Sequence, residues 1–564
     1  MDTPIPETGA EGFLMGLDAA GVDYLFGNAG TDFAPVIEAL AGSKAGFMPE
    51  PVLAPHETVA VGMAHGYYLA TGKMQAVMVH TNVGLANASM GVLNAASDNV
   101  PMMIFSGRTP ITTRGHAFSR RTHVQYGQEM YDQSTLVGEA CKFRYELRYP
   151  EQAVPLIRRA ADLAVSEPTG PVYVSLPLEA LHDPIAVHAR ALPAAPVPAS
   201  APAAEHAAIV EAAKLLRRAE RPVIISQRAD AASAKAIAEF AERFSIPVVE
   251  PFTVVNVLPS SHAMFAGYDV GTILAEADVA IVLETSVPWI EETDRPDHLK
   301  ACIHIGNDPH FRQLPYRTYQ TDLAITSGVA SALQALGREF DEPSKNWPKW
   351  GAHARRAYED RHAQLTENAW NKSQLGISNE LLSCCVSDIL DRDALLFNEL
   401  GVVPNAITTV SSRQFFTHPH SGGLGWGVPA ALGAQLADRD RLCIACVGDG
   451  SFIFANPVAC LQAAEALQLP ILIIVKNNKM WNAVRRSVVN GYPDGAAATS
   501  NQMPFVSLSP SPDFALVAKA NRAVGVRVET AKDLASELRR AVEIIGRERR
   551  AVLLDVSVGF ADAN

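Results

Sequence analysis

The sequence lacks the features of a membrane or secreted protein. It has no run of about 18 apolar residues that could span a bilayer, and its first residues carry neither the basic segment nor the apolar run of a signal peptide. Only seven of the 564 residues are cysteines, which is too few for a disulfide scaffold and typical of a reducing compartment. We therefore expect a cytoplasmic protein without a membrane segment.

Positive charge is also scarce. Lysine and arginine number 47 against 60 aspartates and glutamates, so the formal net charge is −13. This balance gives no general attraction to nucleic acid or to anionic membranes. The G-x-x-x-x-G-K-[ST] loop of nucleotide-binding scaffolds is missing as well. We expect small-molecule ligands and no nucleic-acid partner.

One C-x-x-C pair, Cys443 and Cys446, invites a zinc or redox interpretation. The pair lies inside the apolar, strand-like run 442–447, and the sequence has no second pair at zinc-site spacing. We interpret both cysteines as buried structural thiols.

Short apolar, β-branched runs alternate with alanine-rich segments of helical period along the chain. Such runs lie at 76–80, 101–106, 171–176, 222–226, 278–284, 442–447, 470–475 and 551–556. Strands separated by helices imply parallel sheets covered on both faces. A Pro/Ala-rich stretch at 185–206 and a charged break at about 340–375, which includes a predicted helix, divide the chain. We predict three open parallel-sheet α/β domains, at 1–184, 207–340 and 371–564.

The stretch 448–478 begins with Gly-Asp-Gly after one predicted strand and ends with two asparagines after the next. Both ends therefore lie at the carboxyl edge of a parallel sheet, where open sheets bind ligands. The glycines around Asp449 let the backbone turn tightly, and the following helix start offers N–H groups to an anion. A carboxylate and an amide oxygen suit Mg²⁺, which combines few protein oxygens with phosphate oxygens. The pattern predicts a Mg²⁺–diphosphate site; two ordinary loops, with Asp449 as a helix cap, are the alternative.

This stretch resembles the cofactor motif of thiamine diphosphate enzymes, in the branch with acetolactate synthase, benzoylformate decarboxylase and pyruvate decarboxylase. The resemblance covers nearly the whole chain and implies pyrimidine-binding, central and diphosphate-binding domains in that order. It implies that the carboxylate of Asp449, the side chain of Asn478 and the backbone carbonyl of Met480 bind Mg²⁺. It further implies that Gly450 and Ser451 contact the diphosphate.

Two other segments carry the same resemblance. The stretch LAPHETVAVGMAHGYY at 53–68 is similar to the segment that holds the family's essential glutamate, here Glu57. That acid contacts N1′ of the pyrimidine and must be shielded from water; alone, Glu57 would read as a first-turn glutamate favoured by the helix dipole. The glycine-rich segment 418–437 implies that the Gly422 carbonyl accepts the 4′-amino group and that Leu424 supports the bent cofactor.

The residues expected to face the substrate resemble different family members. His80 falls where benzoylformate decarboxylase has an active-site histidine, and a satisfied strand-end histidine is the structural alternative. Thr31, in GNAGTDF, falls where that enzyme has a serine that contacts the substrate carboxylate. Gln128 resembles the glutamine of the acetolactate synthase branch. The resemblance makes these three residues catalytic candidates beside Glu57.

The segment after the two asparagines, 479–495, is expected to line the substrate channel. Trp481 and Val484 would shape it, and Arg485 or Arg486 could meet a carboxylate or phosphate, although a solvated helix face explains the arginines equally well. No glycine-rich loop follows the predicted strand at 222–226. The sequence thus permits FAD on the central domain but gives it no support.

These residues predict decarboxylation of a 2-oxo acid, carboligation, or both, with thiamine diphosphate and Mg²⁺. One alternative is a lyase that cleaves 2-hydroxy ketones or 2-hydroxyacyl-CoA by the same cofactor chemistry. Another is a non-catalytic cofactor-binding subunit, which the presence of Glu57 and Asp449 disfavours. In the resembling family the cofactor lies between the pyrimidine domain of one chain and the diphosphate domain of another, which implies a homodimer or homotetramer.

Overall fold

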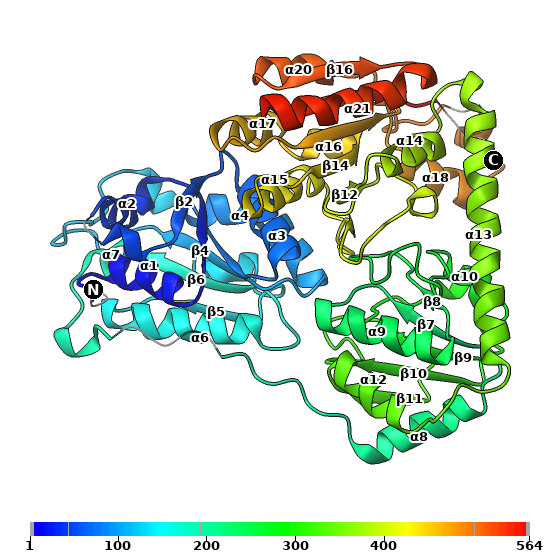
Figure 1. Ribbon diagram of the computed structural model, residues 1–564. Coiled ribbons are helices and arrows are strands. Elements are labelled where there is room, and N and C mark those ends of the chain that lie inside the picture. Colours follow the sequence, from blue (N-terminus) through cyan, green and yellow to red (C-terminus); the bar gives the residue numbers. More distant parts are fainter. Residues whose placement is uncertain are drawn as a thin grey trace.

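The computed structural model describes residues 5–559, except for 43, 192–194, 196, 295 and 501. Its strands form three parallel sheets, flanked by helices, that follow one another along the chain (Figure 1). This architecture confirms the prediction of three open parallel-sheet α/β units. No helix in the described part of the chain combines the length and the apolar character needed to cross a membrane.

The first sheet, at the left of Figure 1, has the strand order β2-β1-β3-β4-β6-β5. Its strands are β1 (Tyr24–Asn28), β2 (Glu50–Leu53), β3 (Gln75–Val79), β4 (Met102–Arg108), β5 (Phe143–Glu146) and β6 (Val172–Pro177). Its helices include α1 (Gly9–Ala19), η1 (Thr31–Phe33), α2 (Ala34–Ala41), α3 (Glu57–Thr71), α4 (Thr81–Ser97), α5 (Val124–Gly127), η3 (Gln133–Leu136), α6 (Ala153–Val165) and α7 (Leu178–His182). Because all neighbours are parallel, the carboxyl ends of β2, β1, β3 and β4 share one edge.

The second sheet, at the lower right of Figure 1, has the order β11-β10-β9-β7-β8. Its strands are β7 (Pro222–Ser226), β8 (Val248–Val249), β9 (Val279–Leu283), β10 (Ala301–Gly306) and β11 (Leu323–Thr326). Its helices are α8 (His206–Arg217), α9 (Ala231–Phe244), α10 (Val270–Leu274), α11 (Glu291–Asp294) and α12 (Val329–Arg338).

The third sheet, at the top of Figure 1, has the order β13-β12-β14-β15-β17-β16. Its strands are β12 (Leu395–Glu399), β13 (Phe415–Thr417), β14 (Cys443–Gly448), β15 (Leu472–Asn477), β16 (Val524–Val528) and β17 (Val552–Ser557). Its helices are α14 (Asn379–Ser387), α15 (Gly427–Ala437), α16 (Asp449–Phe454), α17 (Pro457–Ala466), α18 (Asn482–Gly491), α19 (Ala496–Ser500), α20 (Phe514–Ala520) and α21 (Ala531–Glu548). Cys443 and Cys446 lie buried on β14 as free thiols, which confirms their structural interpretation.

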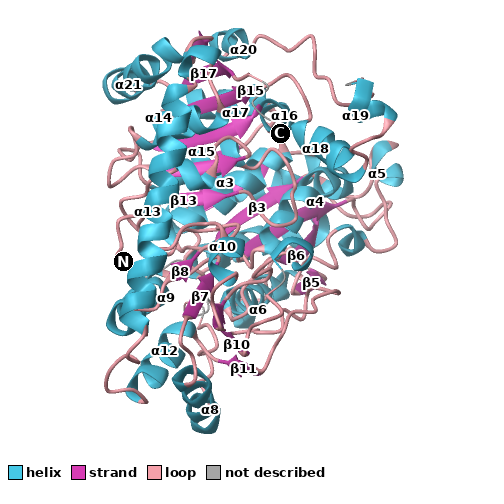
Figure 2. Cartoon of the chain, turned by 90° about the vertical axis from the view of Figure 1, so that its right-hand side faces the viewer, coloured by secondary structure: helices cyan, strands magenta, loops and turns pink. Residues whose placement is uncertain are grey.

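A long helix, α13 (Trp347–Asn371), connects the second sheet to the third and occupies the predicted break (Figures 1 and 2). The indole N–H groups of Trp347 and Trp350 donate to the carbonyls of Ala219 and Pro222 at 2.9 and 2.8 Å. These bonds anchor the first turns of α13 beside the second sheet. The break is thus a packed helix and not a loose linker.

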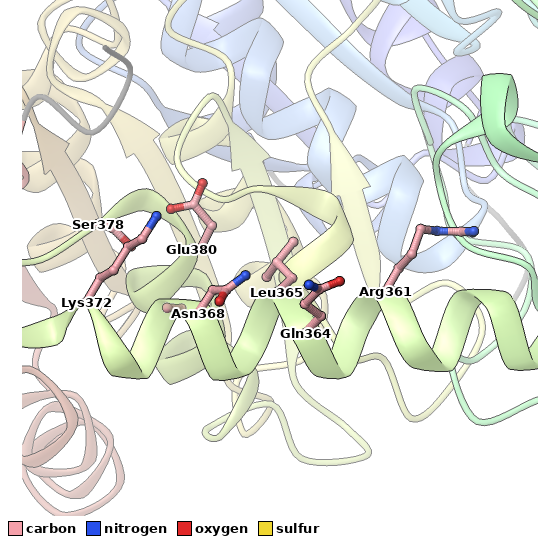
Figure 3. A pocket seen from close by; sticks show the side chains of 8 residues that line it. Arg361, Gln364, Leu365, Asn368, Lys372, Ser378 and Glu380 are labelled. Atoms are coloured by element: carbon pink, nitrogen blue, oxygen red, sulfur yellow. The ribbon is translucent and has the colours of Figure 1, made fainter. Parts of the chain in front are cut away.

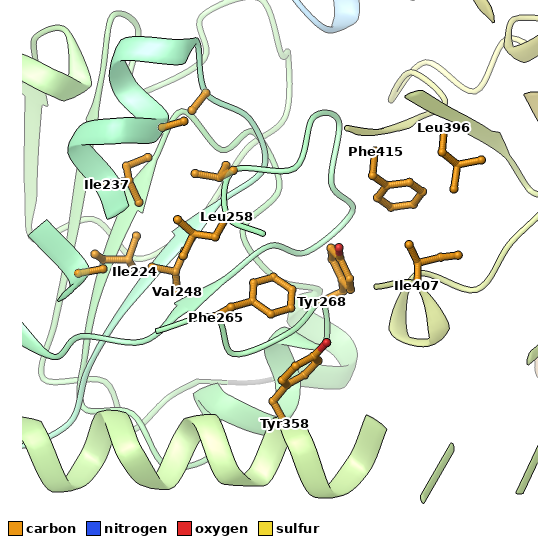
Figure 4. Close-up of a cluster of buried hydrophobic side chains, with 14 of the residues drawn as sticks. Ile224, Ile237, Val248, Leu258, Phe265, Tyr268, Tyr358, Leu396, Ile407 and Phe415 are labelled. Carbon is orange, nitrogen blue, oxygen red and sulfur yellow. The ribbon is translucent and has the colours of Figure 1, made fainter. Parts of the chain in front are cut away.

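Aromatic side chains join the second unit to the third (Figure 4). The ring of Tyr268 packs edge-on against those of Phe265 and of Phe415 on β13, with 5.3 and 6.0 Å between ring centroids. Tyr358 of α13 packs against Phe265 at 5.0 Å. One apolar core therefore runs across both units.

The first and third units meet through α3 and α15. A methyl group on Gly66 would lie 1.9 Å from the carbonyl oxygen of Ala430, and one on Gly433 would lie 1.9 Å from that of Met63. Only residues without a side chain allow such a close approach of two helix backbones. This contact brings together the helix that Glu57 begins and the helix that follows the predicted glycine-rich loop.

Candidate active site

Four predicted residues follow adjacent strands of the first sheet. Thr31 follows β1, Glu57 follows β2 and His80 directly follows β3, while Gln128 lies in the segment after β4. The carboxyl edge of an open parallel sheet is where ligands bind. The sheet topology thus gathers these residues at one edge, although they are spread over about a hundred positions of sequence.

Glu57 is the first residue of α3 and is only 6% exposed. The amide of Asn87, on α4, donates to its Oε2 at 3.2 Å. A methyl group on Gly84 would lie 3.1 Å from its Oε1, so the glycine leaves room for the carboxylate. The acid is therefore shielded from bulk water, as a proton-sharing role requires. The sequence did not single out Asn87 or Gly84, because a helix contact between residues thirty positions apart leaves no local pattern.

His80 is held from two sides. Its Nδ1 lies 2.6 Å from Oδ1 of Asp32, and its Nε2 lies 3.1 Å from the amide nitrogen of Gln128. The hydrogen bond to Asp32 raises the pKa of His80 above its usual value, although burial acts against this effect. Thr31 itself is exposed at the start of η1, whereas its neighbour Asp32 is buried. Asp32 is a site residue that the sequence reasoning missed.

The predicted magnesium ligands follow β14 and β15, neighbouring strands of the third sheet. Asp449 is 4% exposed; its Oδ1 accepts the N–H of Gly450 at 2.9 Å, and its Oδ2 accepts the N–H of Lys479 at 2.6 Å. Burial raises the pKa of Asp449. A buried carboxylate with unused lone pairs favours a cation beside it.

The two asparagines after β15 have different environments. Asn477 is buried, and its amide donates to Asp555 at 2.9 Å and to Ser511 at 3.3 Å. Asn478 is only partly buried, and its Oδ1 accepts the N–H of Met480 at 3.1 Å. The side-chain oxygens of Asp449 and Asn478 are hard donors of the kind that Mg²⁺ prefers, and the carbonyl of Met480 accepts the N–H of Asn482 at 3.0 Å.

The predicted glycine-rich loop lies between β13 and α15. Gly422 has φ +69° and Gly425 has φ +88°, conformations that residues with side chains rarely adopt. From α4 of the first unit, Asn94 donates to the carbonyl of Gly423 at 2.9 Å and accepts its N–H at 3.1 Å. Leu424 is therefore presented on a loop that both units hold.

Glu399, at the end of β12, fixes the other side of this loop. It is fully buried and accepts the N–H groups of Gly425 and Gly427 at 2.6 and 2.7 Å. Burial raises its pKa to about 7. The sequence offered one signal, a glutamate at the end of a strand-like run, but its role depends on a contact with a distant loop.

Trp481 packs against the Gly-Asp-Gly turn. A methyl group on Gly450 would lie 2.2 Å from the indole ring, so the glycine makes room for it. Phe454 of α16 meets the same indole edge-on at 5.8 Å. Val484 and Arg485 follow on α18, where Val484 is exposed and Arg485 is partly buried. Trp481 thus borders the predicted diphosphate site, with the other two channel candidates beyond it.

A separate surface pocket of about 380 Å³ opens between α13 and α14 (Figure 3). Arg361, Lys372 and Glu380 are among the residues that line it, and none of the candidate site residues does. The pocket is therefore separate from the candidate residues at the two sheet edges. Among the described residues, no group of three or more His, Cys, Asp or Glu side chains could hold a metal ion. The ligands predicted beside Asp449 are instead an amide oxygen and a backbone carbonyl.

Comparison with protein families matches three parts of the chain. The description "Thiamine pyrophosphate enzyme, N-terminal TPP binding domain" matches residues 7–136, the central domain of the same enzymes matches 209–336, and their C-terminal TPP binding domain matches 402–556. The central match contains all strands of the second sheet, and the other two matches contain most strands of the first and third sheets.

Curated relatives align over nearly the full chain. A probable 2-ketoarginine decarboxylase of Pseudomonas aeruginosa is 27% identical and covers 92% of this chain and 88% of its own. Benzoylformate decarboxylase of the same species is 26% identical, and the alignment covers 95% of this chain and 96% of that enzyme. The acetolactate synthase large subunit of Lactococcus lactis is 24% identical, with 95% and 91% covered.

Among solved structures, the thiamine diphosphate-dependent 4-hydroxybenzoylformate decarboxylase of Rhodococcus jostii RHA1 superimposes with a TM-score of 0.78. Its sequence identity is 24%, over 99% of this chain and all of that one. This likeness concerns the fold.

Proposed function

Because the chain belongs to the thiamine pyrophosphate enzyme family, with a match in each of its three units, we propose that it decarboxylates a 2-oxo acid, joins the resulting acyl unit to an acceptor, or does both. The relatives named above include decarboxylases of two 2-oxo acids and an acetolactate synthase. The observation that carries the proposal is the shielded carboxylate of Glu57, held by Asn87 at the carboxyl edge of the first sheet.

Thiamine diphosphate, when bound, supplies a nucleophilic carbon and an electron sink for the bond that breaks. Glu57 would hold a proton against the pyrimidine ring, in a place that excludes competing water. His80, whose pKa the charge of Glu57 also raises, would hold or move a proton on the substrate side. Thr31, Gln128, Trp481, Val484 and Arg485 remain the candidates for contact with the substrate.

The diphosphate end would be held by the third unit. Asp449, Asn478 and the carbonyl of Met480 supply the oxygen donors proposed for Mg²⁺. Gly450 and Ser451 lie at the start of α16, where N–H groups can meet an anion. The Gly422 carbonyl and the Leu424 side chain, on the loop that Glu399 and Asn94 hold, are proposed to fix the pyrimidine end.

We also propose the domain limits 1–184, 207–340 and 371–564, a cytoplasmic location and a homodimer or homotetramer. Exposed apolar side chains support assembly through the first and third units; they include Val83, Leu93, Phe454 and Val458. The free thiols support a reducing compartment.

The test is release of CO₂ from protein loaded with thiamine diphosphate and Mg²⁺, across 2-oxo acids from pyruvate to benzoylformate, with product analysis. Release with an aldehyde or acyloin product is expected. The size of the 2-oxo acid that reacts fastest indicates the size of the substrate pocket. No release from protein that holds the cofactor would contradict the proposal and would move the assay to 2-hydroxy ketones.

A further inference from the structure

Asp32 is a buried carboxylate that no part of the proposed cofactor site uses. It is 1% exposed, in η1 between β1 and α2. The neighbouring backbone is shaped to admit it, because a methyl group on Gly107 of β4 would lie 1.8 Å from its Oδ2. Gly30 likewise leaves space for His80, since a methyl group there would lie 2.2 Å from Nδ1 of the ring. Two glycines on different elements thus make room for one carboxylate–imidazole pair.

Both oxygens of Asp32 accept hydrogen bonds. Oδ2 accepts the backbone N–H of Thr81 at 3.1 Å, and Oδ1 lies 2.6 Å from Nδ1 of His80. An ionised carboxylate can only accept, so Nδ1 of His80 must carry the proton. The second nitrogen, Nε2, is then the one that gains or loses a proton, and in the neutral ring it accepts the amide N–H of Gln128 at 3.1 Å.

Gln128 is held in its turn by its sequence neighbour. Glu129 forms ion pairs with Arg108 at 2.7 Å and with Arg120, which lie on β4 and in the loop after it. These pairs fix the segment that brings the carboxamide to His80. The ring of His80 therefore lies between the buried carboxylate of Asp32 at Nδ1 and the neutral carboxamide of Gln128 at Nε2.

We propose that Asp32 is a positioning residue for His80: it keeps the ring in the Nδ1-protonated tautomer and presents Nε2, beside Gln128, as the atom that exchanges a proton with the substrate. That the substrate is a 2-oxo acid rests on the proposed function. The tautomer assigned to His80 does not depend on it.

The charges around His80 act in the same direction. Asp32 in η1 and Glu57 at the start of α3 are the charged groups whose fields raise the pKa of the ring, and Gln128 adds no charge. Both carboxylates therefore favour uptake of a proton at Nε2, and the Gln128 carboxamide must then turn its oxygen toward the ring to accept it.

Asp32→Asn tests the pair with almost no change in volume. An asparagine has one accepting oxygen and one donating nitrogen, but the site holds two donors, His80 Nδ1 and Thr81 N–H. Either the ring must change to the Nε2-protonated tautomer, or the N–H of Thr81 loses its acceptor. The matched control is Asp183→Asn, which removes another Asp–His pair of this unit, Asp183 Oδ1 to His116 Nε2 at 2.8 Å.

The first readout is ¹⁵N NMR of the histidine rings across pH, with His80 assigned by the signal that His80→Gln removes. We expect the Nδ1–H tautomer and a pKa above about 6.5 in the wild type, and loss of both in Asp32→Asn but not in Asp183→Asn. An Nε2–H ring in the wild type overturns the inference, whether or not Asp32→Asn folds.

The second readout is turnover of the best 2-oxo acid. Asp32→Asn should lower kcat by about 10²-fold or more and move its pH profile to lower pH, while Asp183→Asn keeps both. Unchanged kcat in Asp32→Asn overturns the inference even if the tautomer changes. If the NMR result holds but the wild type turns over no 2-oxo acid, the proposed function fails and the assignment of the tautomer stands.

Discussion

At the scale of single residues, two adjacent asparagines at the end of β15 offer a direct test of the metal site. Asn478→Ala removes a proposed Mg²⁺ ligand at a partly buried position, whereas Asn477→Ala removes the buried partner of Asp555. We expect Asn478→Ala to weaken Mg²⁺-dependent cofactor binding with little change in stability. Asn477→Ala should cost about 1–3 kcal/mol of unfolding free energy, because it leaves a buried acceptor unpaired.

Calorimetric titration of thiamine diphosphate with Mg²⁺, together with thermal unfolding of the free proteins, separates the two effects. Unchanged cofactor affinity in Asn478→Ala would count against the metal assignment. The same loss of affinity is expected from Asp449→Ala.

The pH dependence of stability tests the His80–Asp32 pair. The pKa of His80 is raised in the folded protein, chiefly by its hydrogen bond to Asp32. The charged pair therefore stabilises the fold fully below the pKa of unfolded histidine, about 6.5, and this contribution is lost as the pH rises through the higher folded value. The loss of stability in His80→Gln should be larger near pH 5.5 than near about pH 9. Urea unfolding at both pH values measures it, and a loss that does not vary with pH would be evidence against the charged pair.

Residues within one motif could be read from the sequence, and residues that meet across elements could not. Asp449 was singled out by the Gly-Asp-Gly turn after a strand-like run, whereas Glu57 was assigned only through the resemblance of its segment to the family. Asp32 and Glu399 were missed because their roles depend on partners at positions 80 and 425, which only the sheet topology brings near. The position singled out instead of Asp32 was its neighbour Thr31, which lies exposed.

At the scale of elements, the contact between α3 and α15 holds the first and third units of one chain together. Gly433→Ala would place a methyl group 1.9 Å from the Met63 carbonyl oxygen, and the backbones must separate to admit it. We expect a cost of about 1–3 kcal/mol or more, since overpacking strains rigid neighbours. The control is Gly546→Ala in α21, where the added methyl meets nothing within 4 Å, and which should stabilise the helix by about 0.5–1 kcal/mol.

Thermal unfolding of both variants gives the comparison. Equal unfolding temperatures would mean that α3 and α15 do not pack as closely as the two glycines indicate.

The order of elements was predictable because strand-like runs and helical periods alternate regularly. The predicted strand at 76–80 is β3 (Gln75–Val79), and that at 278–284 is β9 (Val279–Leu283). The break at 340–375 was harder to interpret, because the charged surface of α13 hides the packing of Trp347 and Trp350 against the second unit. Charge on one helix face does not reveal what the other face contacts.

At the scale of the whole molecule, the proposed dimer can be tested by mixing two inactive variants. If each site combines the first unit of one chain with the third unit of its partner, a dimer of Glu57→Gln and Asp449→Ala chains contains one intact site. Random assembly of equal amounts should then restore roughly a quarter of wild-type turnover. A site built within one chain would leave every site defective, so mixtures without activity would contradict shared sites.

The most direct test of the whole account is exchange of the C2 proton of bound thiamine diphosphate with deuterium, measured by NMR after acid quench. This measurement requires no knowledge of the substrate. We predict fast exchange in wild-type protein with Mg²⁺ and a rate lower by about 10²-fold or more in Glu57→Gln, because the shielded carboxylate drives the proton transfer. Equal exchange rates in the two proteins would contradict the assignment of Glu57 and the catalytic site built around it.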